Sequence, residues 1–121
     1  MRVKKVKIGI KSIEDSLSEA KNTMEKLERG ERTTKETGVY FTSLEAFRKV
    51  LTPKRQELLH TIRIARPKSI HELAQLTKRN IKNVSDDLKY LEQVGLVERR
   101  EVRKTIRPSI NYDTISLEIA I

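Results

Sequence analysis

The sequence contains no cysteine and no tryptophan among its 121 residues, and it has only four glycines and three prolines. The lack of cysteine excludes disulfide bonds, thiolate zinc sites and cysteine nucleophiles. No apolar run approaches the roughly 20 residues that span a bilayer. The basic N-terminus, MRVKKVKIGIK, also lacks the apolar stretch of a signal peptide. We therefore expect a cytoplasmic protein without a membrane segment.

Histidine is also scarce, and no arrangement typical of a catalytic or metal site is visible. The two histidines, His60 and His71, have neither cysteines nor a matching acidic cluster beside them, so we expect no metal site. We find no phosphate-binding glycine loop and no nucleophile–base arrangement. The sequence therefore predicts a protein that is not an enzyme and that needs no cofactor.

Aromatic residues make up only 4% of the chain, and hydrophobic residues 36%, so the core is built mainly from Leu, Ile and Val. This length favours one domain, with room for an appended arm.

Positive charge is abundant and unevenly distributed. The net charge is +9, and residues 53–108 alone carry 14 basic and 7 acidic residues, which gives +7. Such an excess favours a polyanionic partner, because each neutralised phosphate releases condensed counterions. The alternative is that the protein is basic for solubility alone.

The first third of the chain predicts a strand, a helix and a loop. Residues 3–10 alternate with the period of a half-buried strand. Ser12 then caps a helix that Gly30 ends. The apolar stripe of this helix consists of Ile13, Leu17, Ala20, Met24 and Leu27. It needs a partner surface, which is either its own domain or a second subunit. Residues 28–38 contain no apolar side chain before the final glycine and predict a loop.

Cap residues divide the middle of the chain into short helices. Residues 39–41 predict a short strand, and Ser43 caps the helix that follows. Thr52 with Pro53 begins another helix, which runs to about Ile64.

The last part of the chain predicts two helices and three strands. Ser69 with Glu72 forms a capping box for a helix over 70–77. The next helix ends at Gly95, and its apolar face comprises Ile81, Val84, Leu88, Leu91 and Val94. Residues 96–108 read as strand, basic turn and strand, and the tail YDTISLEIAI alternates like a further strand.

Residues 69–100, SIHELAQLTKRNIKNVSDDLKYLEQVGLVERR, resemble the winged helix-turn-helix domain of MarR-type transcriptional regulators. The segments ELA and GLVERR, with Val84 and Leu88, fall at the spacings of that family. The whole arrangement is also similar to small prokaryotic DNA-binding regulators and antitoxins. Lys78 departs from the pattern, because it occupies a turn position where many such domains have glycine, and this leaves the geometry of the turn open.

The resemblance implies an α+β fold, mainly α: a winged helix-turn-helix with an N-terminal strand-helix extension and a C-terminal strand. We expect a dimerisation arm at 1–42, a DNA-binding domain at 43–108 and the last strand at 109–121. The apolar stripe of the first helix and the two terminal strands are the expected dimerisation elements, and the strands could pair across subunits.

The helix after residue 80 is the expected DNA-reading helix, because its outer face is free to enter the major groove. The candidate residues on it or at its start are Arg79, Asn80, Lys82, Asn83, Asp86 and Lys89. Asn83 could pair with adenine, Lys82 could reach guanine or phosphate, and Asp86 could accept from a cytosine amino group. Neighbouring side chains on a helix diverge by about 100°, so we expect Asp87 to point away from DNA. The alternative is a solvated helix face.

The hairpin that follows is the expected wing. Its five cations are Arg99, Arg100, Arg103, Lys104 and Arg107. They would meet phosphates or a minor groove, unless they form only a charged edge that resists aggregation. Lys54 and Ser69 begin helices and could hold phosphates there.

The sequence thus predicts a transcriptional regulator that binds specific double-stranded DNA as a homodimer. Two alternatives remain open: a non-specific DNA-binding protein, or a protein-interaction module such as the antitoxin of a toxin–antitoxin pair.

Overall fold

A computed structural model describes residues 4–30 and 38–121 of the chain, apart from the side chain of Ile13. Most of the predicted loop at 28–38 therefore lies outside the described residues, as does the first residue of the predicted strand at 3–10. The described chain mixes helices and strands, and about half of its residues are helical.

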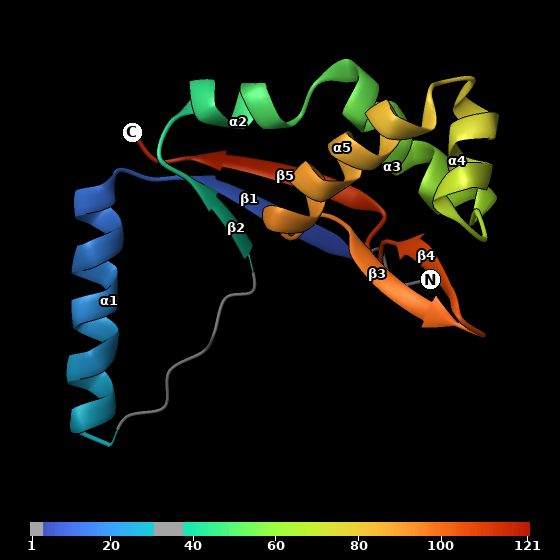
Figure 1. Ribbon diagram of the computed structural model, residues 1–121. Helices are drawn as coiled ribbons and strands as arrows, with labels where there is room; N and C mark the ends of the chain where they lie inside the picture. Colours follow the sequence, from blue (N-terminus) through green and yellow to red (C-terminus); the bar gives the residue numbers. More distant parts are fainter. Residues whose placement is uncertain (1–3, 31–37) are drawn as a thin grey trace.

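The first and last strands lie side by side in a parallel sheet with the order β2-β1-β5 (Figure 1). β1 (Lys5–Ile10) is central, between β2 (Gly38–Phe41) and β5 (Thr114–Ile119). Ile8 lies opposite Val39 on one side and opposite Leu117 on the other. Since paired residues share a face, the alternating pattern gathers the apolar side chains of all three strands on one face of the sheet.

The pairing of β1 corrects the prediction that both terminal strands are available to a second subunit. Both edges of β1 are occupied within the chain, so the free edges of this sheet, as far as it is described, belong to β2 and β5. The pairing of β1 with β5 begins at Asp113, whose N–H donates to the Lys4 carbonyl at 2.8 Å. The Asp113 carboxylate accepts from the Lys4 N–H at 3.3 Å and from Arg63 Nε at 3.1 Å, which fixes the register.

The segment between β2 and β5 forms four helices and a hairpin. The helices are α2 (Leu44–Val50), α3 (Pro53–Ala65), α4 (Ile70–Thr77) and α5 (Ile81–Gln93). The antiparallel hairpin consists of β3 (Glu98–Val102) and β4 (Thr105–Ser109). The order from α3 to β4, three helices followed by a hairpin, is consistent with the predicted winged helix.

One hydrophobic core joins the helices to the sheet. Leu58, Leu73 and Leu91 come from three different helices, and each is fully buried, as is Ile8 of β1. Tyr112 closes the core near the hairpin, where its hydroxyl donates to the Leu96 carbonyl at 2.8 Å. Burial of this phenol raises its pKa to about 12. The sheet and the helices between β2 and β5 therefore share a single core.

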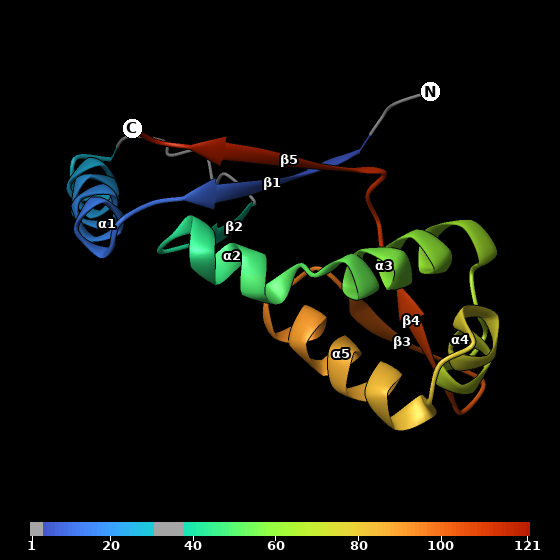
Figure 2. The same ribbon diagram turned by 90° about the horizontal axis from the view of Figure 1, so that it is seen from above.

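The helix α1 (Ile13–Glu28) extends away from the rest of the molecule, at the end opposite α4 (Figures 1 and 2). Its apolar residues Leu17, Met24 and Leu27 are 66%, 62% and 58% exposed, and Ala20 is also exposed. The sequence left open whether this stripe packs on its own domain or on a second subunit. The described side chains of the stripe do not pack on their own domain.

Local capping explains where the helices begin. The side-chain oxygens of Ser12, Ser43, Thr52 and Ser69 each accept from the backbone N–H three residues later, at 3.1–3.3 Å. These four predicted caps are confirmed. Asn80 is the N-cap of α5, since its Oδ1 accepts from the Lys82 N–H at 2.8 Å.

The turn between α4 and α5 has the geometry that glycine usually supplies, although Lys78 occupies it. Lys78 adopts φ 55° and ψ 42°, in the left-handed region. Its N–H donates to the Gln75 carbonyl at 3.2 Å, and the Arg79 N–H donates to the Ala74 carbonyl at 3.0 Å. Together these bonds form a Schellman motif. The departure from the family pattern therefore leaves this backbone conformation intact.

Candidate nucleic-acid interface

The outer face of α5 is exposed and lies opposite its buried face. Val84, Leu88 and Leu91 face the core. Because an α-helix has 3.6 residues per turn, Lys82 and its neighbours on the same stripe lie on the opposite side. The exposed side chains on or beside this stripe are Lys82, Asn83, Asp86 and Lys89. Two lysines, an amide and a carboxylate thus stand on one face, and these groups can hydrogen-bond to base edges and phosphates.

Asp87 turns inward from this face, as predicted, and holds two arginines. Its Oδ1 lies 3.1 Å from Arg55 Nε, and its Oδ2 lies 2.7 Å from Arg79 Nη2. All three side chains are less than a fifth exposed. Arg55 also donates to the Lys49 and Val50 carbonyls at the end of α2, at 2.9 Å each. The ion-pair network therefore fixes α5 against α2, α3 and the turn before α5.

Sequence reasoning missed the pairing of Arg55 with Asp87. Arg55 lies 32 positions before Asp87, so no local pattern connects the two. Its guanidinium carbon also lies 4.5 Å from the centre of the Tyr90 ring, which adds a cation–π contact on α5.

Three predicted DNA-contacting residues at the starts of α4 and α5 are engaged within the protein. The guanidinium of Arg79 is held by Asp87, and its Nη1 is buried without a hydrogen-bond partner among residues 4–30 and 38–121. Asn80 and Ser69 use their side-chain oxygens to cap α5 and α4. Lys54, by contrast, is exposed in the first turn of α3. Arg79, Asn80 and Ser69 thus contribute to the positions of the helices.

The hairpin separates its five cations onto different sides. Arg99 pairs with Glu92 of α5, and its cross-strand neighbour Pro108 is buried, so this pair faces the helices. Because successive side chains alternate, the next pair, Arg100 and Arg107, faces away from α5. The remaining two cations form the tip of the hairpin.

The tip is a two-residue turn made of Arg103 and Lys104. Val102 pairs with Thr105, and the two residues between them have φ of 50° and 66°. Two positive φ angles are typical of a type I′ turn, where Asn-Gly is the preferred pair. The turn therefore holds two cations in a backbone conformation that costs free energy for L-residues.

A basic residue with a positive φ angle also occurs at two other positions in this part of the chain. Among the described residues, those other than glycine with positive φ are Arg66, Lys78, Arg103 and Lys104. Every one is basic and lies between α3 and β4. Strained backbone often coincides with functional sites. Here the strained positions all carry positive charge.

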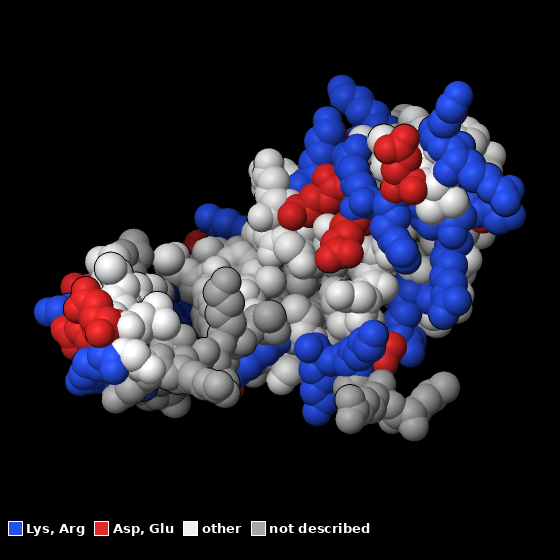
Figure 3. Space-filling view, turned by 90° about the horizontal axis from the view of Figure 1, so that it is seen from below, with Lys and Arg blue, Asp and Glu red and all other residues white. Residues whose placement is uncertain are grey.

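Basic side chains gather at the end of the molecule that carries α5 and the hairpin. Figure 3 shows Lys and Arg covering much of this end, with few acidic side chains among them. At the opposite end, on α1, acidic and basic side chains are mixed. The basic surface therefore coincides with the exposed face of α5 and with the hairpin tip.

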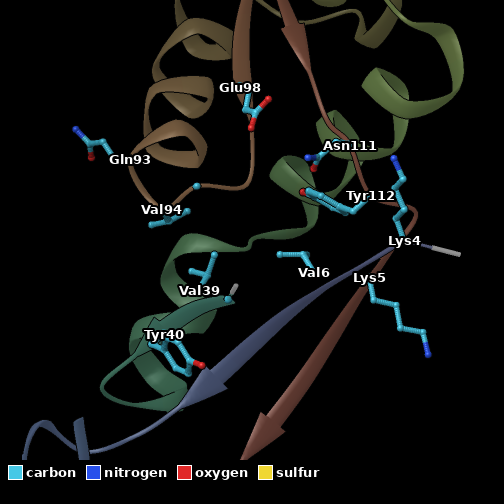
Figure 4. Close-up of a pocket in the computed structure, with 12 residues that line it drawn as sticks. Lys4, Lys5, Val6, Val39, Tyr40, Gln93, Val94, Glu98, Asn111 and Tyr112 are labelled. Carbon is cyan, nitrogen blue, oxygen red and sulfur yellow. The ribbon is translucent and has the colours of Figure 1, made fainter. Parts of the chain in front are cut away.

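A wide hollow of about 860 Å³ lies between the sheet and the end of α5 (Figure 4). Val6, Val39 and Val94 line it, and Lys4 and Glu98 bring charges of both signs. This hollow offers no concentration of one charge and lies apart from the outer face of α5.

Among the described residues, no group of three or more His, Cys, Asp or Glu side chains is arranged to hold a metal ion. Nor does any helix in residues 4–30 and 38–121 combine the length and apolar character needed to cross a membrane.

Comparison with known proteins finds one family. The sequence model of the HVO_A0114 family matches residues 50–117, from the last residue of α2 into β5. No curated protein matches the sequence. Among solved structures, a MarR-like transcriptional regulator from Thermotoga maritima is 17% identical, with a TM-score of 0.48. The similarity covers 83% of this chain and 65% of the regulator, so the chain spans less than two thirds of that protein's length.

Proposed function

This chain belongs to the HVO_A0114 family through residues 50–117, and we propose that it is a transcriptional regulator that binds specific double-stranded DNA as a homodimer. One observation carries the proposal: the free polar face of α5 and the two-cation hairpin tip share the basic end of the molecule. A helix of this kind fits the major groove, while a wing tip meets the backbone.

The proposed roles follow from where each side chain lies. Lys82, Asn83, Asp86 and Lys89 read base edges or adjacent phosphates from the outer face of α5. Arg103 and Lys104 neutralise phosphates from the tip, and Lys54 does so at the start of α3. In this proposal residues 43–108 form the DNA-binding domain.

Selection from a random pool of duplex DNA, at two salt concentrations, tests the proposal. We expect enrichment of an inverted repeat, because a two-fold dimer presents two copies of α5. Tight binding without enrichment would instead indicate a non-specific DNA-binding protein. Absence of binding at low salt would overturn the proposal.

Single substitutions separate base reading from backbone binding. Asn83→Ala should reduce discrimination at one position of the selected site by about 1–3 kcal/mol. Arg103→Gln should weaken all sequences alike and reduce the salt dependence by the equivalent of about one phosphate. If the two variants behaved alike, the separate roles of helix and tip would be refuted.

The proposed dimer forms through the apolar stripe of α1, with a second copy of the chain as its occupant. Leu17, Met24 and Leu27 are exposed along one stripe, and an identical stripe matches it in length and chemistry. Met24→Glu should produce monomers in analytical ultracentrifugation, because it places a charge in the interface. Asn22→Glu, on the opposite face of α1, should leave the dimer intact.

The exposed stripe of α1 also favours a second candidate, a protein-interaction module of the antitoxin type. In that case the native chain, without its protein partner, sediments as a monomer; the two candidates overlap where an antitoxin also represses its own promoter. A dimer whose dissociation by Met24→Glu also weakens DNA binding supports the regulator instead.

A further inference from the structure

A pocket lined by four arginines lies at the base of the hairpin, apart from the outer face of α5. Its volume is about 380 Å³, and it opens between the end of α3, the hairpin and the segment that leads into β5. The charged residues that line it are Arg63, Arg66, Arg100, Arg107 and Asp113. With four cations and one carboxylate, the lining has a net charge of +3.

Two of these arginines form a direct cross-strand pair. Arg100 and Arg107 are opposite one another in the register of β3 and β4. Like charges directly opposite on a sheet are destabilising. Neither side chain forms an ion pair with a carboxylate among the described residues.

Arg107 has a further unmet requirement. Its Nε is buried and has no hydrogen-bond partner in the part of the chain that the structure describes. A buried donor without a partner costs free energy, and the cost is larger for a charged group. An acceptor in the pocket would meet this requirement if the Arg107 side chain turned its Nε toward it.

The carboxylate of the pocket is already committed elsewhere. Asp113 accepts from Arg63 Nε at 3.1 Å and from the Lys4 N–H at 3.3 Å. The hydrogen bond from Arg63 is the main cause that holds its pKa below the ordinary value. Asp113 therefore neutralises Arg63 and leaves the other three arginines to an external anion.

The end of helix α3 explains the presence of only two of the four arginines in this pocket. Cations at the end of a helix interact favourably with its last carbonyl groups, which explains Arg63 and Arg66. It does not explain Arg100 and Arg107, because they belong to the hairpin. Their presence beside the end of α3 requires another reason.

We propose that this pocket binds a small molecule through its phosphate group, with Arg66, Arg100 and Arg107 as the ligands. Guanidinium groups bind phosphate oxygens with charge-assisted and often bidentate hydrogen bonds. The volume lies in the range of small-molecule sites. The cross-strand pair faces away from α5, so duplex DNA held by α5 does not supply this phosphate. The site is therefore independent of the proposed DNA binding.

Calorimetric titration of the full chain with pyrophosphate, in the absence of DNA, tests the site. We expect one site per chain and about tenfold weaker binding in Arg107→Gln. Arg100→Gln changes an exposed side chain, so it tests the same ligand set if Arg107→Gln fails to fold. Arg103→Gln, at the hairpin tip, removes the same charge outside the pocket and should leave the affinity unchanged.

Three results would overturn the proposal. The first is absence of pyrophosphate binding. The second is an equal loss of affinity in Arg103→Gln, which would indicate attraction by overall charge. The third comes from titrating random duplex DNA: if Arg100→Gln reduces its salt dependence by about one phosphate, the pocket holds the DNA backbone instead. Failure of DNA binding alone would refute the proposed function and leave this site standing.

Discussion

Stability and DNA binding should change in opposite directions when the hairpin tip is replaced. The change is Arg103→Asn together with Lys104→Gly, which introduces the residues that the turn geometry favours. Both positions now hold cations at positive φ, 50° and 66°. The substitution therefore relieves the backbone and removes two charges at once.

The gain in stability follows from two opposing contributions. A left-handed L-residue costs roughly 1–2 kcal/mol, and asparagine and glycine tolerate the conformation better than arginine and lysine. Glycine also makes the unfolded chain more flexible, which costs about 0.5–1 kcal/mol. The net expectation is about 1 kcal/mol of added stability, or a melting temperature higher by about 4 °C.

The loss in DNA binding is set by the charges. If each cation neutralises one phosphate, removing both reduces the slope of log K against log salt by about 1.8. The slope is measured by fluorescence anisotropy with a labelled duplex at several salt concentrations. The stability is measured by thermal unfolding of the same preparation.

A charge-matched control separates the two effects. Arg103→Gln with Lys104→Gln removes the same charges but supplies neither asparagine nor glycine. It should change the salt slope equally and shift the melting temperature much less. A lower melting temperature in the Asn-Gly variant would refute the argument about strain, and an unchanged slope would refute the phosphate contacts of the tip.

Three further predictions concern the framework around this surface. Asp87→Ala leaves two largely buried arginines unpaired and should lower the free energy of unfolding by about 2–4 kcal/mol, measured by urea denaturation. Asp86→Ala, at an exposed neighbouring position, should change the free energy of unfolding by less than about 0.5 kcal/mol. Comparable losses in both variants would contradict the role of the ion-pair network. Burial raises the pKa of Tyr112 from 10.0 to about 12 in the folded protein. The stability that the neutral phenol contributes is therefore complete below pH 10 and should be lost as pH rises from 10 to 12. Tyr112→Phe should remove that part of the pH dependence. Lys78→Gly should keep or slightly raise the melting temperature, and a fall of several degrees would show that the lysine side chain stabilises the turn.

Local features of the fold were predictable because their causes are local. Ser12 and Ser69 could be recognised as caps since each acts on an N–H three residues away. Gly95 ends α5 as predicted, with φ of 83° and the Leu96 N–H donating to the Leu91 carbonyl at 2.8 Å. The inward direction of Asp87 followed from the divergence of neighbouring side chains on a helix and from the repulsion between two acids and phosphate.

The three-stranded sheet was not predictable in the same way. Alternation in β1 and β5 shows which side chains share a face, but it does not identify the neighbouring strand. The sequence left these strands open to a second subunit, whereas they pair with each other. Likewise, Arg100 and Arg107 could be placed on the hairpin from the sequence. Which side of the hairpin they face, however, depends on the strand register, in which the neighbouring pair of Arg99 and the buried Pro108 faces the other way. Long-range pairing, rather than local preference, decides both outcomes.

The pairing of β1 with β5 also has a consequence for folding. The two strands meet across 109 positions of sequence, while the helices and the hairpin between them rely on much nearer contacts. Contacts close in sequence form faster. At a synthesis rate of roughly 5–20 residues per second, β5 is made about 5–20 seconds after β1. Ile8, which is fully buried in the finished core, gains its neighbour on β5 only then. We therefore expect closure of the sheet to come late in folding during synthesis.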